Sequence, residues 1–171
     1  DQFFPAVTRH RSYARPSRRQ AATPNIPRPR YVHLPDPRPQ RTFGIVLDTS
    51  GSMDRHLLAK ALGTIASYAM SRDVPAVRLV FCDAEAYDEG YVAPETVGDK
   101  VRVKGRGGTI LQPGIDLLTR ADDFPATAPI LIITDALCDH FHVRREHAIV
   151  VPQGRMLPFT PRGPVFRITM G

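Results

Sequence analysis

The chain has 171 residues, with 23 Lys and Arg against 17 Asp and Glu, so its formal net charge is +6 and its isoelectric point is about 9.8. Hydrophobic residues make up 42% of the chain, which is enough for a packed core and excludes a fully disordered protein. No stretch approaches the ~18 apolar residues of a transmembrane helix, and the charged residues 1–16 lack the pattern of a signal peptide.

Positive charge and proline gather in the first quarter of the chain. Residues 1–42 hold nine Arg against two Asp, a net charge of +7, whereas residues 43–171 hold 14 Lys and Arg against 15 Asp and Glu, a net charge of −1. Eight of the 17 prolines also lie before residue 43. Because proline favours extended polyproline-II backbone, residues 1–42 are predicted to be a basic linker or arm. The start without Met and the length of the arm suggest that another domain precedes it.

From residue 43 onward, short apolar runs alternate with amphipathic stretches. Strands are predicted at 43–47, 77–82, 85–92, 100–104, 129–133, 147–151 and 165–169, and helices at 53–72 and 113–121. Only the strand at 85–92 is expected to run antiparallel. Continuous apolar strands alternating with helices indicate a three-layer α/β domain over residues 43–171, with a mostly parallel central sheet and helices on both faces.

Polar oxygen-bearing residues follow two of the predicted buried strands. Asp48, Ser50 and Ser52 form a D-x-S-x-S pattern after the first strand, Asp135 follows the strand at 129–133, and Thr109 follows a pair of glycines. The carboxyl ends of parallel strands open onto one edge of a sheet, so these side chains are expected to converge. Carboxylate and hydroxyl oxygens suit Mg²⁺ or Mn²⁺ and not Zn²⁺, while Ca²⁺ is less favoured. Ser52 is also expected to cap the following helix.

At these residues the sequence resembles the von Willebrand factor A (VWA) domain, which has a Rossmann-like fold. The D-x-S-x-S pattern, the downstream Thr and the strand-end Asp match the metal-ion-dependent adhesion site (MIDAS) of that family. The resemblance implies that Asp48, Ser50, Ser52, Thr109 and Asp135 are direct or water-mediated ligands of the ion. It also implies that the open position on the ion takes an Asp or Glu carboxylate from a protein partner.

A narrower resemblance points to bacterial VWA-like proteins described as predicted metal-dependent peptidases. It is carried by residues 12–20, 41–48 and 157–166. In that family a metallopeptidase domain precedes the VWA-like domain, and many such proteins are thought to work with MoxR-type AAA+ ATPases. This chain has no H-E-x-x-H motif, so no catalytic residue is assigned to it. It departs from related domains at Ile110, where Asp is frequent, and at Ala136, where Gly is common.

Other metal and enzyme interpretations of the sequence are weaker. Haloacid-dehalogenase phosphatases also place a nucleophilic Asp at a strand end, but they need an acid/base Asp two residues later, where this chain has Ser50. A zinc site has suitable ligands in the spacing C-x-H-x-H-x₄-H at residues 138–147, but no second half, which favours a surface loop. Asp83 and Glu85 are either outer carboxylates around the metal or part of a solvated turn.

Three functions therefore remain open. The first is a metal-dependent protein-interaction module. The second is the regulatory or substrate-presenting part of a metallopeptidase whose catalytic domain lies outside this sequence. The third is a nucleic-acid binder acting through residues 1–42, which the net charge of −1 over residues 43–171 disfavours. No membrane partner is expected, and the two cysteines are too few for a disulfide framework, which favours the reducing cytoplasm.

Overall fold

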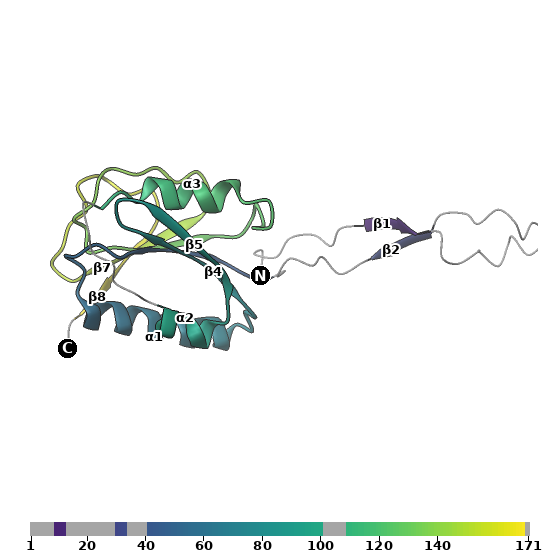
Figure 1. The fold of residues 1–171 in the computed structure, drawn as a ribbon, viewed down its shortest axis with the longest axis horizontal. Helices are drawn as coiled ribbons and strands as arrows, with labels where there is room; N and C mark the ends of the chain where they lie inside the picture. Colours follow the sequence, from purple (N-terminus) through teal and green to yellow (C-terminus); the bar gives the residue numbers. More distant parts are fainter. Residues whose placement is uncertain (1–8, 13–29, 34–40, 101–108, 170–171) are drawn as a thin grey trace, which may run out of the picture. The chain divides into compact units, whose positions relative to one another are not determined.

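A computed structural model describes residues 9–12, 30–33, 41–100 and 109–169, which fall into two units that we describe separately. In the smaller unit, strand β1 (Arg9–Ser12) pairs antiparallel with strand β2 (Arg30–His33), as labelled in Figure 1. The prediction of an extended arm did not include these two strands. The rest of residues 1–40 lies outside the described residues, so the boundary between arm and domain stays a prediction.

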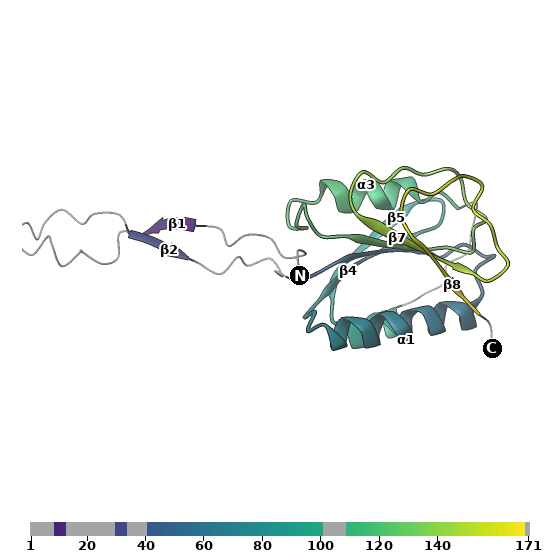
Figure 2. The same cartoon turned by 180° about the vertical axis from the view of Figure 1, so that it is seen from behind.

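The larger unit is built on a six-stranded sheet in the order β5-β4-β3-β6-β7-β8 (Figures 1 and 2). Its strands are β3 (Gly44–Asp48), β4 (Val77–Cys82), β5 (Ala86–Val92), β6 (Ile130–Ile133), β7 (His147–Pro152) and β8 (Val165–Ile168). Only β5 is antiparallel to its neighbour, which confirms the predicted mostly parallel sheet. The central strands are buried because they are apolar on both faces, as the continuous apolar runs required.

Helices cover both faces of this sheet. Helix α1 (Arg55–Ser71) lies against one face with the short turns η2 (Pro94–Thr96) and α2 (Val97–Lys100), and α3 (Gln112–Arg120) lies against the other (Figure 1). The three-layer α/β fold is therefore confirmed. The strand predicted at 100–104 is wrong at Lys100, which ends α2, and residues 101–104 lie outside the described residues. Among the described residues, no helix combines the length and hydrophobicity needed to cross a bilayer.

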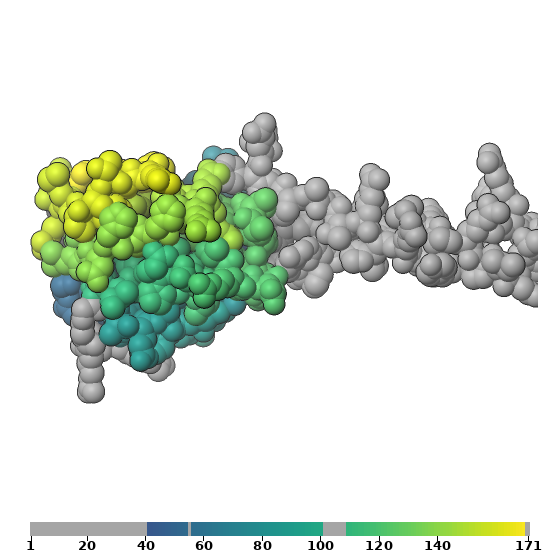
Figure 3. All heavy atoms as spheres, turned by 90° about the horizontal axis from the view of Figure 1, so that it is seen from above, coloured from purple at the N-terminus to yellow at the C-terminus, as the bar shows by residue number. Residues whose placement is uncertain are grey.

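Irregular segments, and not helices, cover the sheet beside α3. The connections from β6 to β7 and from β7 to β8 contribute buried or half-buried side chains to the core on this face, including Phe141, Val143 and Phe159. The rings of Phe141 and Phe159 meet edge to face, with their centroids 4.8 Å apart. Figure 3 shows these connections, coloured light green to yellow, spread over this side of the molecule.

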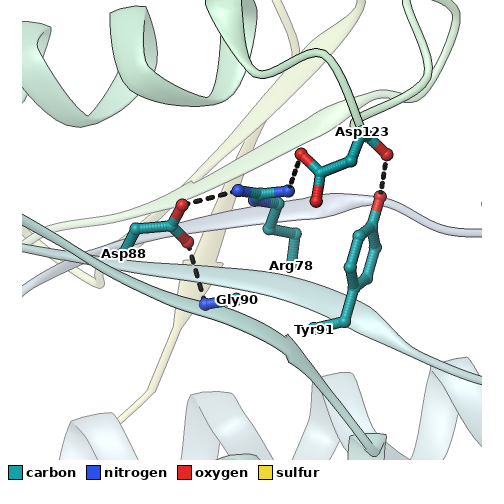
Figure 4. A network of polar contacts seen from close by, with 5 residues as sticks. All are labelled: Arg78, Asp88, Gly90, Tyr91 and Asp123. Atoms are coloured by element: carbon teal, nitrogen blue, oxygen red, sulfur yellow. Dashed lines mark hydrogen bonds and ion pairs between the residues drawn. The ribbon is translucent and has the colours of Figure 1, made fainter.

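A buried arginine joins the edge of the sheet to the end of α3. Arg78 of β4, whose side chain is 9% exposed, pairs with Asp88 of β5 at 2.6 Å and with Asp123 beyond α3 (Figure 4). The Tyr91 hydroxyl donates to the carbonyl of Asp123, and Gly90 N donates to Asp88 Oδ1. Burial lowers the pKa of Arg78, but the two carboxylates outweigh burial and raise it overall. The guanidinium therefore stays charged and locks β5 to the loop after α3.

Candidate functional site

The two acidic residues of the predicted site lie at the ends of neighbouring strands. Asp48 ends β3, and Asp135 follows β6 by two residues. These strands are parallel neighbours, with Leu47 opposite Ile133. The chain adds β4 and β5 on one side of β3 and then continues with β6 on the other side, so the strand order reverses between β3 and β6. Ligands of open α/β sheets bind at such a switch point. Both carboxylates are buried, with exposed fractions of 0% for Asp48 and 4% for Asp135.

Asp48 is held by hydrogen bonds to both of its carboxylate oxygens. Ser50 N donates to Oδ1 at 2.9 Å, and the Thr134 hydroxyl donates to Oδ2 at 2.8 Å. Burial raises the pKa of Asp48, and these hydrogen bonds from Ser50 and Thr134 lower it without reversing the shift. The negative charge of Asp135 raises that pKa further, so the two buried carboxylates repel each other.

Asp135 has one carboxylate oxygen without a partner. Its Oδ1 accepts a hydrogen bond from Leu137 N at 2.9 Å. Its Oδ2 is buried and forms no hydrogen bond with the residues that the structure describes. Among the residues that the structure describes, neither Asp48 nor Asp135 forms an ion pair with a basic side chain. A buried carboxylate oxygen in this condition is costly unless a cation neutralises it.

The hydroxyl groups of the predicted site lie on two loops. Ser50 is buried and its Oγ lies 3.1 Å from that of Ser52. Thr109 is buried, and its carbonyl accepts from Asp139 N at 3.4 Å, which ties it to the loop after β6. The prediction that Ser52 caps α1 is wrong, because the Asp54 carboxylate accepts from the first free amides of the helix.

Sequence reasoning missed one polar residue at this edge, Thr134, and left the role of another, Asp83, open. Thr134 was not among the predicted site residues, although its position next to β3 across the sheet makes it the hydroxyl that donates to Asp48. Asp83, directly after β4, is buried, its Oδ1 accepts from Glu85 N, and its carbonyl accepts from Ile110 N at 3.0 Å. Glu85 is exposed, so the turn interpretation fits these two residues in part, with the Asp83 carboxylate buried within it.

Ala136 has a left-handed backbone at the centre of this edge, with φ of 68°. Its N–H donates to the Thr134 hydroxyl at 3.2 Å. An L-residue with a Cβ is strained in this conformation, and Gly is not.

The zinc interpretation gains no support from the structure. Among the described residues, no group of three or more His, Cys, Asp or Glu side chains is placed to hold a metal ion. The oxygen donors at the ends of β3 and β6 are a different set, with two carboxylates and the rest hydroxyls.

Burial raises the pKa of Cys82 to about 12 and that of Cys138 to about 11, so both free thiols are protonated at neutral pH.

Comparison with known proteins agrees with this architecture. A family model described as "VWA-like domain (DUF2201)" matches residues 43–160. The curated proteins include no match to the chain. The crystal structure of an aerotolerance-related membrane protein from Bacteroides fragilis NCTC 9343 is similar, with a TM-score of 0.54 and 17% identity over 70% of this chain and 72% of that one. This likeness supports a shared fold only. Because the family model matches more than half of the sequence, the chain belongs to the VWA-like domain (DUF2201) family.

Proposed function

We propose that the domain is a metal-dependent protein-interaction module of MIDAS type. Asp48, Ser50, Ser52, Thr109 and Asp135 would hold Mg²⁺ or Mn²⁺, and the ion would bind an Asp or Glu carboxylate of a protein partner. The observation that carries this proposal is Oδ2 of Asp135, a buried carboxylate oxygen with no hydrogen-bond partner among the described residues.

The chemistry of the donors fits a hard divalent cation. Two buried carboxylates that repel each other gain most from a positive charge placed between them, because a low dielectric strengthens that attraction. The remaining donors are hydroxyl oxygens, which suit Mg²⁺ and Mn²⁺. Zn²⁺ prefers nitrogen and sulfur ligands, which this set lacks.

The choice of partner follows from charge. Two carboxylates neutralise a divalent ion only formally, and neutral hydroxyls leave it able to attract a further anionic ligand. A carboxylate from another protein supplies that ligand.

The resemblance to bacterial VWA proteins makes a MoxR-type AAA+ ATPase the first partner to test. The same module would serve a metallopeptidase whose catalytic domain lies elsewhere. The free thiols of Cys82 and Cys138 fit a cytoplasmic location.

Thermal unfolding with and without the ion tests the proposal. We expect Mg²⁺ or Mn²⁺ to raise the melting temperature of the chain, because a ligand at 100 times its Kd stabilises the folded state by about 2.7 kcal/mol. For a domain of this size that free energy corresponds to a rise on the order of 5–15 °C. Asp48→Asn and Asp135→Asn should abolish the rise.

Asp139→Asn is the matched control. Asp139 is an exposed carboxylate on the same loop as Asp135 and is not a predicted ligand, so its removal should leave most of the Mg²⁺ effect in place. A melting temperature that does not respond to millimolar Mg²⁺ or Mn²⁺ contradicts the proposal. An equal response in Asp135→Asn contradicts it as well.

A further inference from the structure

Two large apolar side chains lie exposed beside the proposed metal ligands. Ile110 follows Thr109 and is 41% exposed, and Leu137 lies two residues after Asp135 and is 52% exposed. We infer that the partner presents a large apolar side chain next to its Asp or Glu, and that this side chain packs on Ile110 and Leu137. This inference rests on the proposed function and adds the determinant of specificity.

Hydrogen bonds of the backbone fix the two segments that carry these side chains. Ile110 N donates to the carbonyl of Asp83 at 3.0 Å, and Leu137 N donates to the Asp135 carboxylate at 2.9 Å. The hydrogen bond from Asp139 N to the carbonyl of Thr109 joins the two segments. Because the backbone of these two segments is already ordered, binding a partner requires little further loss of backbone entropy.

The apolar surface continues along α3. Ile110 is among the residues that line a shallow groove of about 500 Å³, together with Pro113 and Leu117. Its polar lining residues are Gln112, Asp116 and Arg120. The groove gives a partner segment room for apolar side chains next to Thr109, one of the proposed metal ligands.

The charge of this edge determines which kind of partner it can bind. Asp48, Asp83 and Asp135 are buried at the strand ends and Asp139 is exposed beside them, so without a cation the edge repels an acidic segment. A bound ion would orient the partner's carboxylate, and Ile110 and Leu137 would supply contact area. The occupant is therefore a protein segment in which an acidic residue neighbours a large aliphatic or aromatic residue.

Selection from a display library of random short peptides tests the inference on the full chain. In Mg²⁺, and not in EDTA, the selected peptides should carry Asp or Glu within two positions of Leu, Ile, Met or Phe. Binding of the best peptide should weaken about tenfold in Ile110→Ser and in Leu137→Ser, because covering one large aliphatic side chain is worth about one factor of ten. Replacing the apolar residue of the peptide by Ser should weaken binding similarly.

Met70→Ser is the matched control, because Met70 is 53% exposed and lies at the end of α1 remote from its capping residue Asp54. It should leave peptide affinity unchanged, and the melting temperatures of all three variants should match that of the parent chain.

Each contrary result identifies which proposal fails. Mg²⁺-dependent peptides that share an acid but no apolar neighbour overturn the inference and leave the metal-dependent module standing. Unchanged affinity in the Ile110→Ser/Leu137→Ser double variant does the same. Mg²⁺-dependent self-association of the chain would assign the surface to a second copy and overturn the inference. Absence of any Mg²⁺-dependent acidic peptide, together with an absent metal effect on melting, overturns the proposed function itself.

Discussion

In the part of the domain that the structure describes, charged side chains are buried in two places, and their charges are balanced differently. Around Arg78, one guanidinium faces the carboxylates of Asp88 and Asp123, so the protein supplies both signs (Figure 4). At the ends of β3 and β6, Asp48 and Asp135 are buried with no basic partner among the described residues. The charges of the first cluster are paired within the chain, and in that sense we call it complete, although Nε of Arg78 is buried without a hydrogen-bond partner among the described residues. The second is incomplete, which is typical of a site that binds something.

Breaking the complete cluster should give the largest effect on stability. Arg78→Met keeps an apolar stem and leaves Asp88 and Asp123 without their partner. Asp88 and Asp123 are 27% and 57% exposed, so water can solvate them again, and we expect a loss on the order of 2–3 kcal/mol in the free energy of unfolding. Urea denaturation measures it, and the loss should be the same with and without Mg²⁺.

The control for this prediction is the exposed arginine of α3. Arg120, whose side chain is 81% exposed, lies 3.6 Å from Asp116 one helical turn earlier. Such surface pairs contribute about 0.5 kcal/mol or less, so Arg120→Met should be nearly neutral. A loss in Arg78→Met no larger than that in Arg120→Met would show that the buried cluster is not what holds β5 to the end of α3.

Without metal, removing a charge from the incomplete cluster should stabilise the domain, which is the opposite of the loss expected for Arg78→Met. In EDTA, Asp135→Asn removes one of two repelling buried charges, so we expect the free energy of unfolding to rise by about 1 kcal/mol. In Mg²⁺ the order should reverse, because the parent chain gains stability from the ion and the variant does not. Chemical denaturation in the two buffers gives both values.

Asp139→Asn again serves as control for this reversal, and it should change stability little in either buffer because its carboxylate is exposed. If Asp135→Asn destabilises the chain in EDTA, the buried charge is compensated within the protein and the contrast between the two clusters is wrong.

The fold was largely predictable because buried parallel strands carry a strong sequence signal. The apolar runs that became β3, β4 and β6 were placed within one residue of their observed bounds. The short turns η2 and α2 and the pair β1–β2 were missed, since none is long enough for a periodic pattern. Arg78 lay inside a predicted buried strand, but its partners come from a separate strand and a loop, which local patterns do not indicate.

The candidate site was predictable in its residue types and not in its hydrogen bonds. The strand ends placed Asp48 and Asp135 on one edge of the sheet. Ser52 was the predicted helix cap, but the path of the backbone, which sequence does not give, makes Asp54 the cap. The role of Thr134 depends on strand register, because only the β3–β6 pairing brings its hydroxyl to Asp48.

The smallest predicted effect concerns backbone strain at the incomplete cluster. Ala136→Gly relieves a left-handed conformation that costs an L-residue roughly 1–2 kcal/mol, but it adds about 0.5–1 kcal/mol of entropy to the unfolded chain. We therefore expect a net gain of about 0.5 kcal/mol in the free energy of unfolding, measured by urea denaturation. Asp73, with φ of 51°, is the control, because Asp tolerates this region better than Ala and Asp73→Gly should gain nothing. Equal gains at both positions would mean that strain is not concentrated at the ends of β3 and β6.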